Sequence, residues 1–264
     1  MILLGGLAVL LLAAAFDVRL RVATYEIASK KVAAPVRLAV VSDLHSCAYG
    51  RGQRTLLDAA AAQAPDAVLL TGDIVDDEMP EDNAWTAVAG LAEAYPCFYV
   101  TGNHEWRIAD TERVLRRMED LGVTVLRGGS AALEANGQSI ALCGIDDPDS
   151  GESEAQLAEV GSTVTENTFT VLLAHRPERI TDYLAYPFDL VVSGHAHGGQ
   201  WRIPGILNGL YAPHQGLFPV YAGGRYDFER AAFIVSRGLA RESTRVPRIF
   251  NRPELVVVNV IPEN

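Results

Sequence analysis

Five short apolar segments of this chain each end at residues whose side chains can bind a metal ion. The segments are VRLAVVSDLH, AVLLTGD, FYVTGNHE, TVLLAH and DLVVSGHAH, and five of the six histidines lie at their ends. Apolar runs of this length are typical of buried strands. The carboxyl ends of strands in an α/β fold share one edge, where such folds place their chemistry. The pattern therefore predicts oxygen and imidazole ligands gathered at one sheet edge, as in a two-metal hydrolase.

Strand-like and helical stretches alternate from residue 35 onward. Helical periodicity is found in three stretches, residues 55–63, 81–94 and 110–121. Further along, hairpins replace most helices, and Asn136-Gly137 is a strong hairpin turn. This order favours an α/β fold of two facing mixed β-sheets, a β-sandwich flanked by helices. Residues 203–224 are rich in glycine, proline and aromatic side chains, and we expect them to form a long loop or lid.

Charge and cysteine content narrow the function classes. The 264 residues carry a formal net charge of −11, which opposes binding to a nucleic-acid backbone, so we expect no nucleic-acid partner. Bound metal cations would reverse this field locally and admit a phosphorylated substrate. Three scattered cysteines are too few for a disulfide framework or a structural zinc site.

The first sixteen residues, MILLGGLAVLLLAAAF, contain no charged side chain. As a helix they would measure about 24 Å, somewhat less than a bilayer core of about 30 Å. Basic residues follow this run, so we expect a membrane anchor with the folded domain on the cytoplasmic side. The alternative is a signal peptide cleaved near residues 13–15, followed by export. The expected organisation is an anchor over residues 1–18, a linker over 19–34 and one catalytic domain over 35–264.

The residue types at the strand ends indicate which metals they would bind. Asp43 and His45 are two positions apart, so in a strand both side chains can reach one ion, and His195 and His197 repeat the spacing. Carboxylate, amide and imidazole ligands without thiolates suit Mn²⁺, Fe or Zn²⁺ rather than a structural zinc site. Two such ions about 3.5–4 Å apart would activate a water molecule for attack on phosphorus.

Taken together, the motifs resemble those of a known family. In chain order they are Asp43-x-His45, Gly72-Asp73-x-x-Asp76, Gly102-Asn103-His104-Glu105, His175 and Gly194-His195-x-His197. This set resembles the calcineurin-like metallophosphoesterases over about residues 35–262. The segments GHAHGGQWRIPG, SRGL and FNRPEL are similar to the membrane-associated bacterial YkuE/YaeI-type phosphodiesterase branch and to the calcineurin-like UDP-2,3-diacylglucosamine pyrophosphatases.

The resemblance implies a role for each matched residue. The metal ligands it implies are Asp43, His45 and His197 for the first ion, Asp73 for both ions, and Asn103, His175 and His195 for the second. His104 would not bind metal; it would act as general acid or transition-state stabiliser, oriented by Asp76. The implied cofactor is a pair of divalent ions, with Mn²⁺ expected first and Fe or Zn²⁺ as alternatives.

The expected function is hydrolysis of phosphodiester or pyrophosphate bonds at the membrane surface. Apolar residues in 203–224 could line a groove for a lipid-linked substrate such as UDP-2,3-diacylglucosamine. One alternative is a phosphomonoesterase acting on phosphoproteins or nucleotides. Another is a non-catalytic scaffold with the same fold, which the intact motif set argues against.

Several polar residues near the motifs have two possible interpretations. Asp146 and Asp147 could support the metal site or form an ordinary acidic turn. Arg107 and Arg202 could each contact a substrate phosphate or form a surface salt bridge. His214 is interpreted as an ordinary residue of the 203–224 loop.

Overall fold

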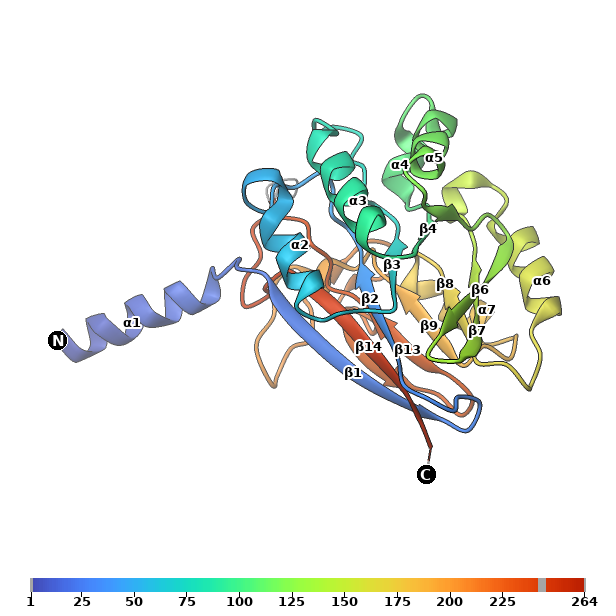
Figure 1. Ribbon diagram of the computed structural model, residues 1–264. Helices are drawn as coiled ribbons and strands as arrows, with labels where there is room; N and C mark the ends of the chain where they lie inside the picture. Colours follow the sequence, from blue (N-terminus) through green and yellow to red (C-terminus); the bar gives the residue numbers. More distant parts are fainter. Residues whose placement is uncertain (1, 242–245, 264) are drawn as a thin grey trace.

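Two six-stranded sheets face each other and carry helices on their outer surfaces (Figure 1). The computed structural model describes residues 2–241 and 246–263. The first sheet consists, in spatial order, of β1 (Arg21–Ser29), β14 (Glu254–Pro262), β2 (Val36–Val41), β3 (Ala67–Thr71), β4 (Cys97–Val100) and β5 (Thr124–Val125). The second consists of β12 (Gly224–Asp227), β13 (Ala232–Val235), β9 (Leu190–Ser193), β8 (Thr170–Leu173), β7 (Gln138–Gly144) and β6 (Gly129–Ala135). Both sheets mix parallel and antiparallel pairs, which confirms the predicted α/β fold with mixed sheets.

The central strands are apolar throughout because both of their faces are buried. In β3, Ala67 and Leu69 point into the core between the sheets, whereas Val68 and Leu70 pack beneath the helices of the first sheet. Successive side chains of a strand point to opposite faces, so a two-sided core requires an uninterrupted apolar run. Each fully buried Val or Leu of this kind contributes about 1.5–3 kcal/mol to stability.

The helices form the outer layers. Their bounds are α1 (Ile2–Ala15), α2 (Arg54–Ala61), α3 (Asp82–Ala94), α4 (Asn103–Arg107), α5 (Thr111–Asp120), α6 (Ser153–Thr163) and α7 (Ile180–Tyr183), with short 3₁₀ helices at Arg51–Gln53, Pro148–Ser150, Pro177–Arg179 and His197–Gly199. Helices α2, α3 and α5 cover the first sheet, whereas α6 and α7 cover the second (Figure 1). In α5, Val114, Leu115 and Met118 are buried, because positions three and four apart share one helical face.

One edge of the sandwich collects the carboxyl ends of the parallel strands from both sheets. Strands β2, β3 and β4 are parallel, as are β7, β8 and β9. The two sets meet at this edge, since the backbone N–H of His195, after β9, donates to Asp43, after β2. All predicted metal-binding motifs follow strands that end here.

Two segments differ from the sequence-based expectation. The stretch expected as a linker, residues 19–34, contains β1, an edge strand paired parallel with β14 along its whole length. Only Ala23 and Ile27 within β1 are buried, so the strand lacks the long apolar run that marks the central strands. The expected 203–224 loop contains a small hairpin of β10 (Tyr211–Ala212) and β11 (Gly216–Leu217).

The expected membrane-anchor helix is not supported. Helix α1 has 14 residues and projects away from the two sheets (Figure 1). At 1.5 Å per residue it is about 21 Å long, against about 30 Å for the hydrocarbon core. Across residues 2–241 and 246–263, no helix combines the length and hydropathy needed to cross a bilayer.

Candidate metal centre

The predicted ligands lie in the loops and at the starts of the short helices that follow the strands of the convergent edge. These residues, Asp43, His45, Asp73, Asn103, His175, His195 and His197, are all buried. Asp43, His45, Asp73, His195 and His197 have positive φ angles of 49°, 46°, 52°, 64° and 46°. Asp and His tolerate this left-handed region better than most residues, but each instance still costs about 1–3 kcal/mol. Residues with backbone strain of this kind cluster at active sites and ligand-binding sites.

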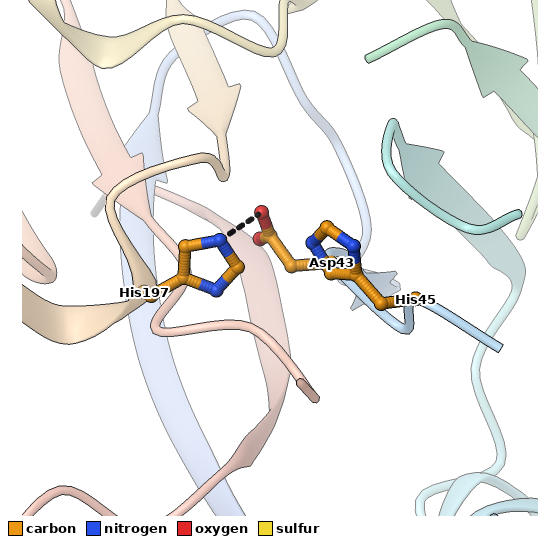
Figure 2. Close-up of side chains that lie close together, drawn as sticks. All are labelled: Asp43, His45 and His197. Atoms are coloured by element: carbon orange, nitrogen blue, oxygen red, sulfur yellow. Dashed lines mark ion pairs between the residues drawn. The ribbon is translucent and has the colours of Figure 1, made fainter. Parts of the chain in front are cut away.

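Asp43, His45 and His197 form the first group of potential ligands (Figure 2). One ligand atom from each lies within 4.8 Å of the others, and Nε2 of His197 is 3.9 Å from Oδ1 of Asp43. Asp43 is held in place because the hydroxyl of Ser42 and the backbone N–H of His195 both donate to its carboxylate. Asp43, in the loop after β2, is thus joined to the loop that follows β9.

Asp73 lies between this group and a second one. Its Oδ2 atom is 3.5 Å from Nε2 of His45 and 3.1 Å from Nε2 of His175. Asp73, His175 and His195 also place their ligand atoms within 4.8 Å of one another. A single carboxylate that faces both groups has the position required of a bridging ligand.

Unsatisfied polar atoms provide a test of whether these residues fit metal ions. Among the described residues, six buried side-chain atoms of the predicted ligands make no hydrogen bond: His45 Nε2, Asp73 Oδ2, Asn103 Oδ1, His175 Nε2, His195 Nδ1 and His197 Nδ1. A buried polar atom without a partner costs about 1–3 kcal/mol, and such atoms are rare in native proteins. Nitrogen and oxygen atoms of this kind fit the donor set of divalent cations, and three of the six, Oδ2 of Asp73 with Nε2 of His45 and Nε2 of His175, face one another.

In three of these histidines the other ring nitrogen makes a hydrogen bond that fixes the orientation of the ring. Nδ1 of His45 donates to Asp76 at 2.7 Å, and Nδ1 of His175 donates to the Thr71 carbonyl at 2.8 Å. In His195 the roles are reversed, since Nε2 lies 2.9 Å from Nδ1 of His214. A hydrogen bond at one ring nitrogen leaves the other as a lone-pair donor, which is the usual arrangement behind metal-binding histidines.

The electrostatics of the centre also favour a cation. Burial holds the pKa values of His195 and His197 well below the usual range, so both imidazoles are neutral, the form that coordinates metal. Burial acts in the same direction on His175, but the nearby Asp73 carboxylate outweighs it and raises the pKa of His175 to about 10. The negative potential of Asp73 that keeps a proton on the buried His175 would also attract a divalent cation, which would replace that proton.

His104 borders the centre and is the most exposed of the predicted site residues. Its Nδ1 atom lies 2.5 Å from Asp77 and 3.3 Å from Asp76. Burial alone would lower its pKa, but these carboxylates and Asp73 raise the pKa of His104 to about 9. Asp76 thus contacts His45 more closely than His104, and Asp77, which the motif comparison did not single out, is the nearer partner of His104. Nη1 of Arg107 lies 3.2 Å from the other ring nitrogen of His104.

Glu105 supports the loop that carries Asp73, a role that the sequence pattern did not assign. Its fully buried carboxylate accepts hydrogen bonds from the backbone N–H groups of Asp73, Ile74, Val75 and Gly102. Its place in the Gly-Asn-His-Glu motif was the only available signal. Gly238 was also missed: a Cβ there would lie 2.6 Å from Cβ of Asp43.

Asp146, Asp147 and Arg202 all make buried contacts near the metal centre. Asp147 accepts two hydrogen bonds from the buried Arg176, and the same guanidinium contacts His214, so this pair lies behind His195. Asp146 accepts from Thr101 and Arg127. Arg202 is buried, donates to the Gly198 carbonyl and makes no ion pair among the described contacts.

Comparison with known proteins gives one family and several bacterial relatives. Residues 36–199 match the family described as calcineurin-like phosphoesterase. The chain is 30% identical over 205 residues to the uncharacterized metallophosphoesterase YkuE of Bacillus subtilis, an alignment that covers 76% of this chain and 69% of YkuE. It is also 30% identical over 242 residues to the phosphodiesterase YaeI of Escherichia coli, covering 88% of this chain and 84% of YaeI.

Solved structures support the fold. A dimetal phosphatase from Danio rerio superposes with a TM-score of 0.51 at 15% identity, covering 77% of this chain and 88% of that one. A phosphopantetheinyl hydrolase from Mycobacterium tuberculosis superposes with a TM-score of 0.50 at 13% identity, covering 83% of this chain and 96% of that one. At such low identity these likenesses concern the fold alone.

Proposed function

Because this chain belongs to the calcineurin-like phosphoesterase family, we propose that it hydrolyses phosphodiester or pyrophosphate bonds, with a lipid-linked phosphate ester as its substrate. The protein is a metallophosphoesterase, a hydrolase of phosphoric esters. The family depends on two metal ions, and the clustered Asp and His side chains agree with this requirement.

Oδ2 of Asp73 faces Nε2 of both His45 and His175, and none of these three buried atoms makes a hydrogen bond among the described residues. This is the observation that supports a dinuclear site. We assign Asp43, His45 and His197 to one ion, Asn103, His175 and His195 to the other, and Asp73 to both. Two divalent cations held there would polarise the phosphoryl group and lower the pKa of a bound water toward neutrality. We propose Mn²⁺ as the resident metal, because the mixed carboxylate, amide and imidazole set contains no thiolate.

His104 is the proposed proton donor to the leaving group. One of its ring nitrogens lies within 4.8 Å of ligand atoms of His45 and Asp73, so it borders the reacting centre. The carboxylates of Asp76 and Asp77 keep the ring protonated and fix its orientation. A protonated imidazole at this position can stabilise charge on phosphorus and donate a proton to the departing alkoxide.

Exposed apolar side chains support a lipid-linked substrate and action at a membrane surface. Large apolar residues are exposed on α1 and on the 203–220 segment: Val9, Leu10, Leu11, Leu12, Ile206, Leu217, Phe218 and Val220. Four of these residues, Val9 to Leu12, are consecutive on α1, and clustered exposed apolar side chains mark sites of interaction. Attachment through the N-terminal segment and a cytoplasmic location for the catalytic domain remain predictions from the sequence.

Activity on two simple substrates tests the proposed reaction. Protein loaded with Mn²⁺ should hydrolyse bis(p-nitrophenyl) phosphate faster than p-nitrophenyl phosphate, whereas the reverse order would favour a phosphomonoesterase. His104→Ala should lower kcat by about 10²–10⁴-fold on a diester with an alkyl leaving group, with metal content unchanged. Glu119→Gln on the exposed face of α5 is the control. Inactivity on both substrates with two metals bound would favour the scaffold alternative.

A second assay addresses the lipid-linked substrate. UDP-2,3-diacylglucosamine and soluble nucleotide diphosphates should be compared at equal concentration with the metal-loaded protein. We expect the lipid-linked compound to have the higher kcat/KM. A soluble nucleotide that outperforms every lipid-linked compound would contradict this part of the proposal.

A further inference from the structure

A cavity of about 520 Å³ lies beside the metal centre and is lined by three arginines. Arg21, Arg202 and Arg237 contribute its polar wall, together with Asn208. Its apolar wall is formed by Ile203, Pro204, Gly205, Ile206, Leu207 and Phe250. None of the side chains assigned to the metal centre lines this cavity.

The three arginines come from different elements that meet at the convergent edge of the sheets. Arg21 is the first residue of β1, and Arg237 follows β13. Arg202 follows the short helix that begins at His197, and its Nη1 donates to the carbonyl of Gly198 at 3.0 Å. A Cβ on Gly223 would lie 2.7 Å from Cγ of Arg237 and 3.6 Å from Nη1 of Arg202, so both arginines pack against this glycine. The cavity is therefore adjacent to the metal centre but separate from it.

The positive charge of this cluster is only partly neutralised. Glu254, fully buried at the start of β14, is 3.3 Å from Nε of Arg21 and 3.5 Å from Nε of Arg237. Within residues 2–241 and 246–263 the Arg202 guanidinium has no carboxylate partner, and it donates to the Gly198 carbonyl and to the side-chain oxygen of Asn208. Three guanidinium groups against one carboxylate leave a formal charge of +2, in a chain whose total is −11.

Two further observations show that this charge lacks a complete set of partners. Nε of Arg237 is buried and makes no hydrogen bond among the described residues, with Oε2 of Glu254 3.5 Å away. Burial lowers the pKa of Arg202 to about 10, and the proximity of Arg237 acts in the same direction. Arginines forced together in this way are stabilised by a bound anion, because each guanidinium can donate two parallel hydrogen bonds to oxygen atoms.

We propose that the cavity lined by Arg21, Arg202 and Arg237 is a second anion-binding site that takes a phosphate group. A phosphate dianion matches the residual charge of +2, and its oxygen atoms can accept from several guanidinium groups at once. The apolar wall, with Ile203 and Ile206 exposed, can accommodate an organic substituent on that phosphate. The ligand class is therefore a phosphate ester, from either a soluble compound or a lipid headgroup.

Two substitutions with opposite expected effects test the site in metal-loaded protein. Arg21→Gln lowers the cluster charge to +1 and should weaken binding of radiolabelled inorganic phosphate by about tenfold or more in equilibrium dialysis. Glu254→Gln raises the charge to +3 and should strengthen binding by a similar factor. A partly unfolded protein would not bind more tightly, so the second variant separates loss of the site from loss of the fold. Arg116→Gln, which removes an exposed charge from α5, should leave binding unchanged.

A chelator distinguishes phosphate bound at the metal centre from phosphate bound by the arginines, because removal of the metals should release only the former. The phosphate held by the arginines should persist after chelation and should respond to both substitutions. Equal binding by the wild type, Arg21→Gln and Glu254→Gln would overturn the proposal. Complete loss of phosphate binding on chelation would overturn it as well.

Vesicle sedimentation then identifies the source of the phosphate. If the site takes a lipid headgroup, binding to phosphatidylcholine vesicles that contain phosphatidic acid should fall in Arg21→Gln and rise in Glu254→Gln, relative to Arg116→Gln. If the site takes a soluble phosphate ester, Arg21→Gln and Glu254→Gln should change phosphate binding in dialysis, whereas vesicle binding should be the same in these two variants and in Arg116→Gln. Vesicles of phosphatidylcholine alone measure the contribution of the apolar segments.

Discussion

Nε2 of His195 lies 2.9 Å from Nδ1 of His214, a residue supplied by the turn between β10 and β11. Arg176 contacts the same imidazole, and its guanidinium is held by Asp147. This series of contacts leaves the opposite nitrogen, Nδ1 of His195, without a hydrogen-bond partner among the described residues and available to the metal centre. A residue in a loop of irregular sequence thereby controls the orientation of a predicted ligand.

His214→Ala should weaken binding of one of the two metal ions by about 10–100-fold, because His195 loses the contact that orients its ring. Isothermal titration with Mn²⁺ should show one weakened site and one unchanged site. His214→Gln keeps a polar partner for His195 and should restore part of the affinity. Two unchanged sites in His214→Ala would show that this contact has no part in metal binding.

Glu105→Gln should weaken the loop that carries Asp73. Each carboxylate oxygen accepts hydrogen bonds from two backbone N–H groups. The amide of glutamine would replace one of these oxygens by an NH₂ group, which would face two donors and could accept from neither. We expect the free energy of unfolding to fall by about 3 kcal/mol and metal affinity to fall by about tenfold or more. Urea denaturation and metal titration measure the two effects. The exposed Glu119→Gln should change neither.

Gly102→Ala should displace the bridging carboxylate. A Cβ at this position would lie 2.2 Å from Oδ1 of Asp73 and 2.5 Å from its backbone nitrogen, so one of these groups has to move. A shift of about 1 Å in a catalytic centre commonly costs about a hundredfold in rate, and we expect kcat to fall by this order. Gly129→Ala is the matched control, because its Cβ would meet open space. Similar kcat values for both variants would argue against the tight packing of Gly102 on Asp73.

Removal of the metals should destabilise the folded protein. Binding that is specific to the native state stabilises it by about 2.7 kcal/mol per site at a free metal concentration of one hundred times Kd. A chelator should therefore lower the Tm measured by calorimetry, and added Mn²⁺ should restore it. Asp73→Asn should show a smaller shift, because it removes the charge that faces both groups of ligands. Identical Tm values with and without metal would contradict a site inside the fold.

The pair formed by Glu81 and Arg113 should make stability depend on acid pH. Two hydrogen bonds from Arg113, opposed by partial burial, hold the pKa of Glu81 below its usual range. A carboxylate with a depressed folded-state pKa stabilises the protein above its unfolded-state pKa of about 4.3, and this contribution is lost as pH falls through the folded-state value. Glu81→Gln should cost less than about 1 kcal/mol at pH 7, since both side chains are partly exposed. The difference from the wild type should shrink below about pH 4 in urea titrations, and a constant difference would exclude this origin.

Much of the fold could be predicted because the local hydrophobic pattern of its segments matches the side of each strand or helix that is buried in the structure. The run Ala67–Thr71 was expected as a strand and forms β3, and the stretch 81–94 was expected as a helix and contains α3. Strand β1 was missed because an edge strand with few buried residues has no strong apolar pattern. The predicted ligands gather at one edge, as expected from the position of each at the end of a strand.

The sequence by itself determined the ligand types, their order and the strands that carry them, because these depend on periodicity and on residue chemistry along a short segment. Only the tertiary structure decided which groups lie behind the ligands. His214 reaches His195 across 19 positions of the chain, Asp77 reaches His104 across 27, and Arg21 meets Glu254 from the opposite end of the sequence. Such contacts depend on how separate strands and loops pack against one another. That packing results from the burial of the whole core rather than from any local pattern.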